Sequence, residues 1–151
     1  MNSAEAGRSA IQHIFSGDGN FGAMMGRGML RKTRRQAEVE ISDAITRFEK
    51  EHMGRGPLET RTYIVEDMVI IRQKGALTKA EHSLVKSERN VRARELIKQV
   101  RIELIENGRP LLEEMIKGIL RRRIRTLHTD LSTVSGEKVV IFTLDRVPEF
   151  E

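Results

Sequence analysis

The sequence predicts an α+β fold, a two-layer sandwich in which two β-hairpins form a four-stranded sheet with helices on one face. Apolar residues recur at helical spacing within residues 37–48 and again within residues 97–119. Runs rich in β-branched residues, each broken by a short turn, occupy residues 62–71 and 126–144. The expected order is therefore helix, hairpin, two helices, hairpin, with the apolar sides of sheet and helices packed together.

Composition predicts one soluble domain with an aliphatic core. The chain has 151 residues, of which 32% are charged and 38% hydrophobic, and it contains no tryptophan and no cysteine. The lack of cysteine excludes disulfides, thiolate metal ligands and cysteine nucleophiles, and it fits a cytoplasmic protein. No apolar run in the sequence predicts a membrane-spanning helix.

Residues 1–31 predict a glycine-rich N-terminal arm, and residues 32–151 predict the single α+β domain. The arm interleaves glycines with Phe21, Met24 and Met25. It is not a phosphate-binding loop, because it lacks the Gly-Lys-Ser/Thr ending and no strand-like run precedes it. Two interpretations stay open: a flexible arm, and an arm that docks its Phe and Met side chains on a neighbouring subunit.

The first helix is predicted to begin after Thr33, which forms a capping-box pattern with Gln36. It should run to about Met53, where Gly54 supplies a left-handed stop and Pro57 prevents continuation. One apolar face follows at helical spacing: Ala37, Ile41, Ala44, Ile45 and Phe48.

The first hairpin is predicted from the strands 62–65 and 68–71, with Glu66-Asp67 as its turn. Both strands are rich in β-branched residues, and Gly75 ends the second one. A second capping box, Thr78-x-x-Glu81, then begins a short helix.

A long helical stretch is predicted from Glu88 to about Leu120. Gly108 and Pro110 interrupt it, and a proline inside a helix kinks or breaks it. The apolar phase nevertheless continues across the proline, which favours one kinked helix over two independent ones. The residues of this expected apolar face are Ile97, Val100, Leu104, Leu111, Met115 and Ile119.

The second hairpin is predicted to pair residues 126–132 with residues 138–144 across a turn that holds Ser135-Gly136. Alternation divides the last strand into two faces, with Val140, Phe142 and Leu144 on one and Val139, Ile141 and Thr143 on the other.

The stretch Gly54-Arg55-Gly56-Pro57 has two interpretations. Exposed N–H groups beside the Arg55 guanidinium could form an anion-binding nest. The simpler interpretation is a helix stop followed by a turn into a strand, and it accounts for more of the residues. A phosphate loop is not indicated, because such loops follow a strand and precede a helix.

Two basic clusters, Arg31–Arg35 and Arg121–Arg125, stand out against a modest net charge of +5. Clusters of this kind can neutralise phosphates, so a nucleic-acid-binding domain is the alternative function. The structural interpretation of the second cluster is that its cations complement the dipole at a helix C-terminus. Arg121, Arg122 and Arg123 are therefore candidate interaction residues.

His128 and Asp130 are the polar pair most suited to chemistry. They are two residues apart on a predicted strand, so both side chains leave the same face of the sheet. A histidine and a carboxylate could share a metal or form an oriented base. The spacing identifies no third ligand, and a histidine on a polar sheet surface more often makes an ordinary hydrogen bond.

Several motifs together resemble those of the MpsC-like domain family. They are Met53-Gly-Arg-Gly-Pro57, Thr62-Tyr-Ile-Val65, Asp67-Met-Val-Ile-Ile-Arg72, Lys74-Gly-Ala-Leu-Thr78, Leu127-His-Thr-Asp130 and Val140-Ile-Phe-Thr-Leu144. The resemblance covers about residues 33–145. The family takes its name from a bacterial sodium-linked system that generates membrane potential and supports inorganic-carbon uptake. It provides no established catalytic residues to carry over.

The resemblance implies an accessory or regulatory protein, since the membrane-embedded parts of such a system are other polypeptides. We therefore expect a non-enzymatic cytoplasmic protein without cofactor or metal, in peripheral contact with membrane transport subunits. A homodimer is expected from the small core, the open sheet edges and the apolar residues of the arm. The candidate interaction residues are Arg55, Arg121, Arg122, Arg123, His128 and Asp130.

Overall fold

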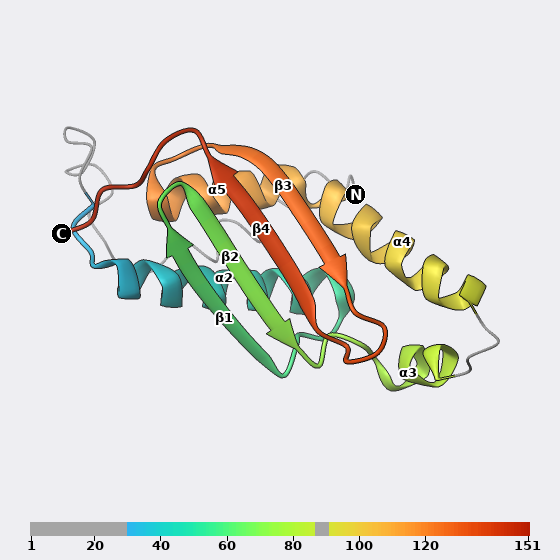
Figure 1. Cartoon of the computed structure of the whole chain (residues 1–151). Coiled ribbons are helices and arrows are strands. Elements are labelled where there is room, and N and C mark those ends of the chain that lie inside the picture. Colours follow the sequence, from blue (N-terminus) through green and yellow to red (C-terminus); the bar gives the residue numbers. More distant parts are fainter. Residues whose placement is uncertain (1–29, 87–90) are drawn as a thin grey trace, which may run out of the picture.

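The computed structural model describes residues 30–86 and 91–151, which form a sheet and a layer of helices behind it (Figure 1). The arm expected at residues 1–31 lies almost wholly outside these residues. The described elements are α2 (Arg34–Met53), β1 (Glu59–Val65), β2 (Met68–Lys74), α3 (Lys79–Val85), α4 (Val91–Asn107), α5 (Arg109–Leu120), β3 (Ile124–Leu131) and β4 (Lys138–Leu144).

The sheet has four strands in the order β1-β2-β4-β3, and every neighbouring pair is antiparallel. Each hairpin contributes two adjacent strands, and the inner strands β2 and β4 join the hairpins. Helices α2 and α5 lie behind the sheet in Figure 1, while its other face is turned toward the viewer. The predicted α+β fold, with two hairpins in one sheet and helices on one face, is confirmed.

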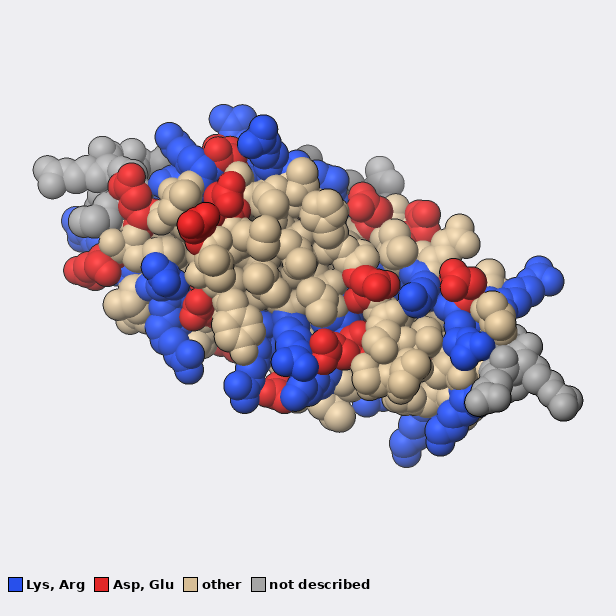
Figure 2. All heavy atoms as spheres, viewed as in Figure 1, with Lys and Arg blue, Asp and Glu red and all other residues tan. Residues whose placement is uncertain are grey.

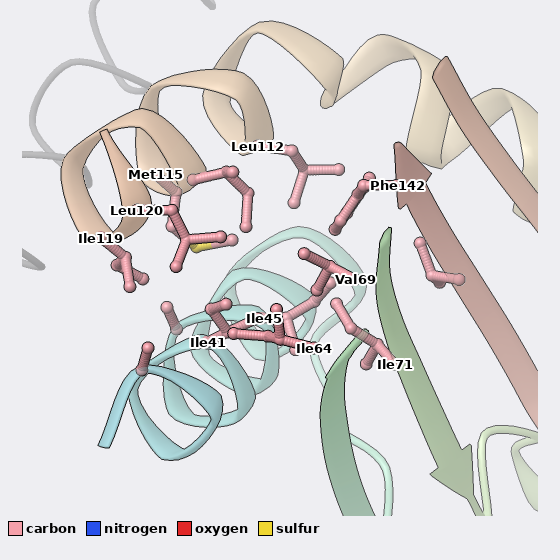
Figure 3. Packing of buried hydrophobic residues seen from close by; sticks show 14 of the residues in the cluster. Ile41, Ile45, Ile64, Val69, Ile71, Leu112, Met115, Ile119, Leu120 and Phe142 are labelled. Carbon is pink, nitrogen blue, oxygen red and sulfur yellow. The ribbon is translucent and has the colours of Figure 1, made fainter. Parts of the chain in front are cut away.

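The main core lies between α2, α5 and the covered face of the sheet, as Figure 3 shows. Strict alternation places Ile71 and Phe142 on this face, and both are fully buried. Burying each large apolar side chain contributes about 1.5–3 kcal/mol. The strand residues of this cluster are Ile64, Val69, Ile71, Val140, Phe142 and Leu144, and the helix residues include Ile41, Ile45, Phe48, Ile105, Leu112, Met115, Ile116 and Leu120.

A polar network continues the covered face toward the C-terminal end of α2. Lys138 and Glu49 form an ion pair although their side chains are only 2% and 5% exposed. The Gln73 amide donates from Nε2 to Glu49 Oε2 at 2.9 Å, while the buried Gln73 Oε1 has no hydrogen-bond partner. A buried ion pair of this kind requires both members, since either one alone would be an uncompensated charge.

The limits of α2 agree with the sequence. Thr33 and Gln36 form the full capping box, with the Gln36 N–H donating to Thr33 Oγ1 and the Thr33 N–H donating to Gln36 Oε1. Gly54 ends the helix with φ of 72°, a left-handed conformation that favours glycine. Both predictions are confirmed.

The long helix expected from residue 88 to 120 is in fact two helices, so three helices rather than two separate the hairpins. Gly108 separates α4 from α5, and Pro110 at the start of α5 has no N–H to continue the hydrogen-bond ladder. A Cβ on Gly108 would lie 2.3 Å from Phe48 Cζ, so the close approach of α2 also requires glycine here. The expectation of one kinked helix was wrong.

The apolar face expected along this stretch is also corrected in α4. Ile97 and Ile105 are buried, but Val100 is 57% exposed and Leu96 is 51% exposed. Helix α4 extends beyond the sheet in Figure 1, so less of its surface finds a partner among the described residues. Helical spacing alone does not reveal where a helix leaves the core.

A smaller apolar cluster holds α3 and α4 against the end of the β3–β4 hairpin. It consists of Leu77, Val85, Ile97 and Leu131, with Ala76 at its margin. The Arg101 guanidinium of α4 donates to both carboxylate oxygens of Glu81 in α3, at 2.5 and 3.1 Å. Glu81 completes the predicted capping box with Thr78, so one carboxylate serves both the start of α3 and its attachment to α4.

Candidate interaction surface

The face of the sheet opposite α2 and α5 is covered by no described element. We call it the open face. The pairing register arranges its side chains in three rows across the strands, so that each row has one residue from β1, β2, β4 and β3 in turn. The rows are Val65, Met68, Thr143 and Thr126; then Tyr63, Ile70, Ile141 and His128; then Arg61, Arg72, Val139 and Asp130.

The middle of the open face is apolar and its margins are charged. Ile70 and Ile141 are directly opposite each other on the inner strands, with Tyr63 beside them at 44% exposure. Figure 2 shows uncharged side chains over the middle of this face, surrounded by groups of lysine, arginine and acidic side chains. An apolar centre with a polar rim is the general anatomy of a protein–protein contact surface.

One end of the open face carries a shallow cavity of about 140 Å³ lined by Glu59, Arg61, Tyr63, Arg72 and Lys74. Arg61 and Arg72 are directly opposite on β1 and β2, an arrangement that is unfavourable for two like charges. Carboxylates offset it: Arg61 Nε lies 2.6 Å from Glu59 Oε1, and Arg72 NH2 lies 2.8 Å from Glu137 Oε2.

These contacts shift the pKa of three groups at this end, Glu59, Arg61 and Arg72. The hydrogen bond from Arg61, followed by the positive charges of Arg61 and Lys74, lowers the pKa of the Glu59 carboxyl below its usual value. The hydrogen bond and negative charge of Glu137 raise the pKa of the Arg72 guanidinium. These shifts favour the charged form of each group, and the region has three basic residues, Arg61, Arg72 and Lys74, beside the carboxylates of Glu59 and Glu137.

His128 and Asp130 both lie on the open face, on the edge strand β3, as alternation implies. The His128 ring nitrogen Nε2 is 3.2 Å from Thr126 Oγ1, and the Asp130 side chain is 81% exposed with Lys98 Nζ at 3.6 Å. Among residues 30–86 and 91–151, no group of three or more histidine, aspartate or glutamate side chains could hold a metal ion.

The other sequence candidates lie elsewhere. Arg55 is exposed in the loop between α2 and β1, next to the left-handed Gly54. Arg121 ends α5 in a left-handed conformation, and Arg123 is held through its backbone N–H, which donates to Asp145 Oδ1. Arg122 is 5% exposed, and its guanidinium donates to the carbonyl oxygens of Val147 and Arg121. The structure therefore brings His128 and Asp130 together, but it separates them from the arginines.

Sequence reasoning missed the cationic end of the open face. The signal was present: a two-residue turn at Glu66-Asp67 pairs Val65 with Met68 and therefore Arg61 with Arg72. The predicted strands stopped at Thr62 and Ile71, so both arginines fell outside them. Strand β1 in fact begins at Glu59 and β2 ends at Lys74.

Fold and surface together define a class: a small two-layer α+β protein whose sheet has one face covered by helices and one face that no described element covers. The family then follows from comparison with known proteins. Residues 33–146 match the family described as "Na+-translocating membrane potential-generating system (MpsC)", and the chain belongs to this family.

One curated protein is similar to this chain over most of its length. The chain is 39% identical over 115 residues to the uncharacterized protein YbcI of Bacillus subtilis (strain 168), which covers 76% of this chain and 90% of that protein. No solved structure matches the chain. No helix of the described residues has the length and apolar character needed to cross a membrane.

Proposed function

We propose that this chain is an accessory or regulatory protein of a membrane cation-translocating system that generates membrane potential. The observation that carries the proposal is family membership over residues 33–146, because the family's description names such a system. In this proposal the chain works on the cytoplasmic side, and other polypeptides form the path through the membrane.

The geometry supports action through protein contacts rather than through catalysis. The open face offers an apolar centre at Ile70 and Ile141 with a charged rim, and α4 presents exposed Leu96 and Val100. Two apolar surfaces on different elements suit a protein that acts through contacts with other polypeptides, further copies of itself included. The polar pair His128 and Asp130 belongs to the rim of the first surface in this proposal.

The direct test is deletion of the gene in its host, followed by measurement of membrane potential with a potential-sensitive dye across a series of sodium concentrations. We expect the sodium-dependent part of the potential to fall and wild-type chain to restore it. Val134→Lys, at a turn residue that is 91% exposed, should restore it equally. Potentials that are unchanged by deletion at every sodium concentration would contradict the proposal.

A companion test separates binding from chemistry at the same site. His128→Ala removes the imidazole from the open face, and its neighbour Thr126 can bond to water instead. We expect this variant to restore the potential fully and the purified chain to contain no stoichiometric metal by elemental analysis. Loss of function in His128→Ala together with bound metal would favour a metal-dependent activity instead.

Nucleic-acid binding is the second candidate function, because the basic clusters 31–35 and 121–125 both contact the C-terminal segment 147–151 and so lie near each other. Glu151 N donates to Lys32 O and Arg122 Nε donates to Val147 O, so both clusters flank residues 147–151. This end also contains counter-charges, since Lys32 Nζ lies 2.6 Å from Glu40 Oε2. A mobility-shift series with arbitrary DNA and RNA decides the matter: binding that falls steeply with salt would support it, and no shift at low salt would remove it.

A further inference from the structure

We propose that the open face is covered by the same face of a second copy of this chain. The two copies would be related by a two-fold axis that runs close to parallel with the strands, above the boundary between β2 and β4. This arrangement is a β-sandwich dimer with the helices of both copies on the outside. It does not depend on the membrane-system proposal, because it is derived from the strand register and the charges alone.

The symmetry follows from the order of the strands. A two-fold axis above the boundary between the inner strands exchanges β1 with β3 and β2 with β4, and it carries each cross-strand row onto itself. In the middle row Ile70 then faces Ile141 of the second copy, and Tyr63 faces His128 of the second copy. The apolar centres therefore coincide, and their contact buries the apolar surface that Ile70 and Ile141 still expose.

The charges favour the same arrangement. In the third row β1 carries Arg61, whose side chain is 67% exposed, and β3 carries Asp130, whose side chain is 81% exposed. The two-fold axis places Arg61 of each copy opposite Asp130 of the other, so the contact forms twice. Both residues also have partners within their own chain, Glu59 and Lys98, and their exposure leaves each accessible for a second contact.

Packed sheets cross at roughly 30° because each sheet is twisted, so facing strands diverge with distance from the axis. The inner residues Ile70 and Ile141 lie next to the axis and stay in register. The outer pair is displaced by a few ångströms, on the order of one residue along a strand, which a long arginine side chain can span. Apolar contacts at the centre and a flexible ion pair at the rim are consistent with this geometry.

The size of the face predicts how strong the dimer should be. Four strands about 4.8 Å apart, with three rows of outward side chains about 7 Å apart, cover a plan area on the order of 400 Å². Standard stable interfaces bury about 800 Å² of accessible surface on each partner. Because side chains project from the sheet, the accessible area of the face is larger than this plan area. It is comparable to the area that a standard interface buries on each partner. We therefore expect a reversible, concentration-dependent dimer.

The first test disrupts the centre of the face. Sedimentation velocity of the full chain over a concentration series should show a reversible monomer–dimer equilibrium. Ile141→Lys adds a charge at the centre and should make the chain monomeric across the series, with an unchanged circular dichroism spectrum. Val134→Lys adds the same charge at an exposed turn away from the face and should leave the equilibrium unchanged.

The second test exchanges the charges of the proposed pair. Arg61→Asp and Asp130→Arg should each weaken dimerisation about tenfold at low salt, because symmetry doubles every contact. The double variant should return the dissociation constant to within about twofold of wild type. Within one chain the exchange instead puts like charges beside Glu59 and Lys98. Rescue can therefore come only from contact between copies.

Three outcomes would overturn the proposal. A wild-type chain that is monomeric throughout the series would assign the open face to a different partner. A dimer that Ile141→Lys leaves intact would place the interface on another surface. A dimer that is weakened by both single charge reversals and is not rescued by the double variant would exclude the two-fold arrangement. None of these outcomes bears on the sodium dependence of the membrane potential.

Discussion

The two faces of the sheet alternate along the same strands, yet they have different physical environments. Ile71 is fully buried under α2 and α5, whereas its neighbour Ile70 points to the open face. Phe142 and Ile141 differ in the same way on β4. The two faces have similar apolar residues at their centres, so composition does not distinguish them. The helices determine which face becomes core.

The covered face of the sheet contains a buried lysine, although lysines usually lie on the surface. Lys138, on the covered face, is 2% exposed and pairs with Glu49, whereas Lys74 on the neighbouring strand is 56% exposed and lies 3.9 Å from Glu59. A lysine is rarely buried without a partner. The same residue type is therefore held in a buried pair on one face and remains available for contact on the other.

Substitutions that break the buried ion pair of Lys138 and Glu49 should destabilise the chain most. Lys138→Met or Glu49→Met alone should lower the free energy of unfolding by about 3–5 kcal/mol, because each leaves an uncompensated buried charge. The double variant should recover part of this loss, since two apolar side chains can replace the pair, but the buried Gln73 amide then lacks its Glu49 acceptor. Urea unfolding monitored by circular dichroism gives these values.

Lys74→Met is the matched control on the open face, and it should change the free energy of unfolding by less than about 1 kcal/mol. If Lys138→Met and Lys74→Met cost the same, the contrast between buried and exposed lysines would be wrong. Additive losses in the double variant would likewise show that the two side chains act separately.

The next effect compares adjacent isoleucines on β2. Ile71→Ala should cost about 2–5 kcal/mol, because it removes buried methyl groups and leaves a cavity in the main core. Ile70→Ala should cost less, about 1 kcal/mol, at protein concentrations where the chain is monomeric, because its side chain is only partly buried and the gap that truncation leaves is open to water. Urea unfolding at low concentration measures both, and equal costs would mean that the open face is covered within the monomer.

A smaller effect concerns the attachment of α3 to α4 through Glu81 and Arg101. Burial raises the pKa of the Glu81 carboxyl, but hydrogen bonds from Arg101 and Thr78 and the charge of Arg101 outweigh burial and hold this pKa below its ordinary value. A lowered pKa stabilises the fold above the unfolded-state pKa of about 4.3, and this stabilisation is lost as the pH falls through the folded-state value.

Glu81→Gln isolates that contribution, because glutamine can still complete the capping box with Thr78. At neutral pH we expect a loss of about 1–2 kcal/mol from the charged hydrogen bonds to Arg101. The difference between wild type and variant should shrink as the pH is lowered below about 4. Urea unfolding at several pH values tests this, and a difference that stays constant with pH would exclude a role for the carboxylate charge.

Local signals in the sequence predicted most of the fold. The capping boxes at Thr33 and Thr78 and the glycine stop at Gly54 depend on contacts within a few residues, so they can be read without tertiary structure. The turn Glu66-Asp67 was predicted although it lacks glycine. Glu66 adopts a positive φ of 54° in this turn, a conformation that is uncommon for residues other than glycine. Strand pairing within each hairpin followed from the same local logic.

Features that depend on distant contacts were not predictable. The sequence placed the interruption at Gly108 and Pro110, but the close approach of Phe48 to Gly108 joins residues far apart along the chain and could not be read from the sequence. Lys138 is buried because Glu49, 89 residues away, is there to pair with it. Among the site candidates, the common face of His128 and Asp130 follows from alternation, but no pattern indicates that Arg122 folds inward while Arg123 stays outside. Long-range packing alone determines that difference.

The open face has an exposed counterpart of the buried ion pair, and its contribution to stability should be small. Arg72 and Glu137 form an ion pair whose side chains are 49% and 30% exposed. A double-mutant cycle with Arg72→Gln and Glu137→Gln should give a coupling free energy of about 0.2–1 kcal/mol, since solvent screens exposed charges. Added salt should reduce this coupling further, whereas the buried pair of Lys138 and Glu49 should respond little. Urea unfolding in low and high sodium chloride measures both. A coupling at Arg72 as large and as salt-resistant as that at Lys138 would show that the open face is shielded from solvent in the monomer, and it would remove the distinction between the two faces.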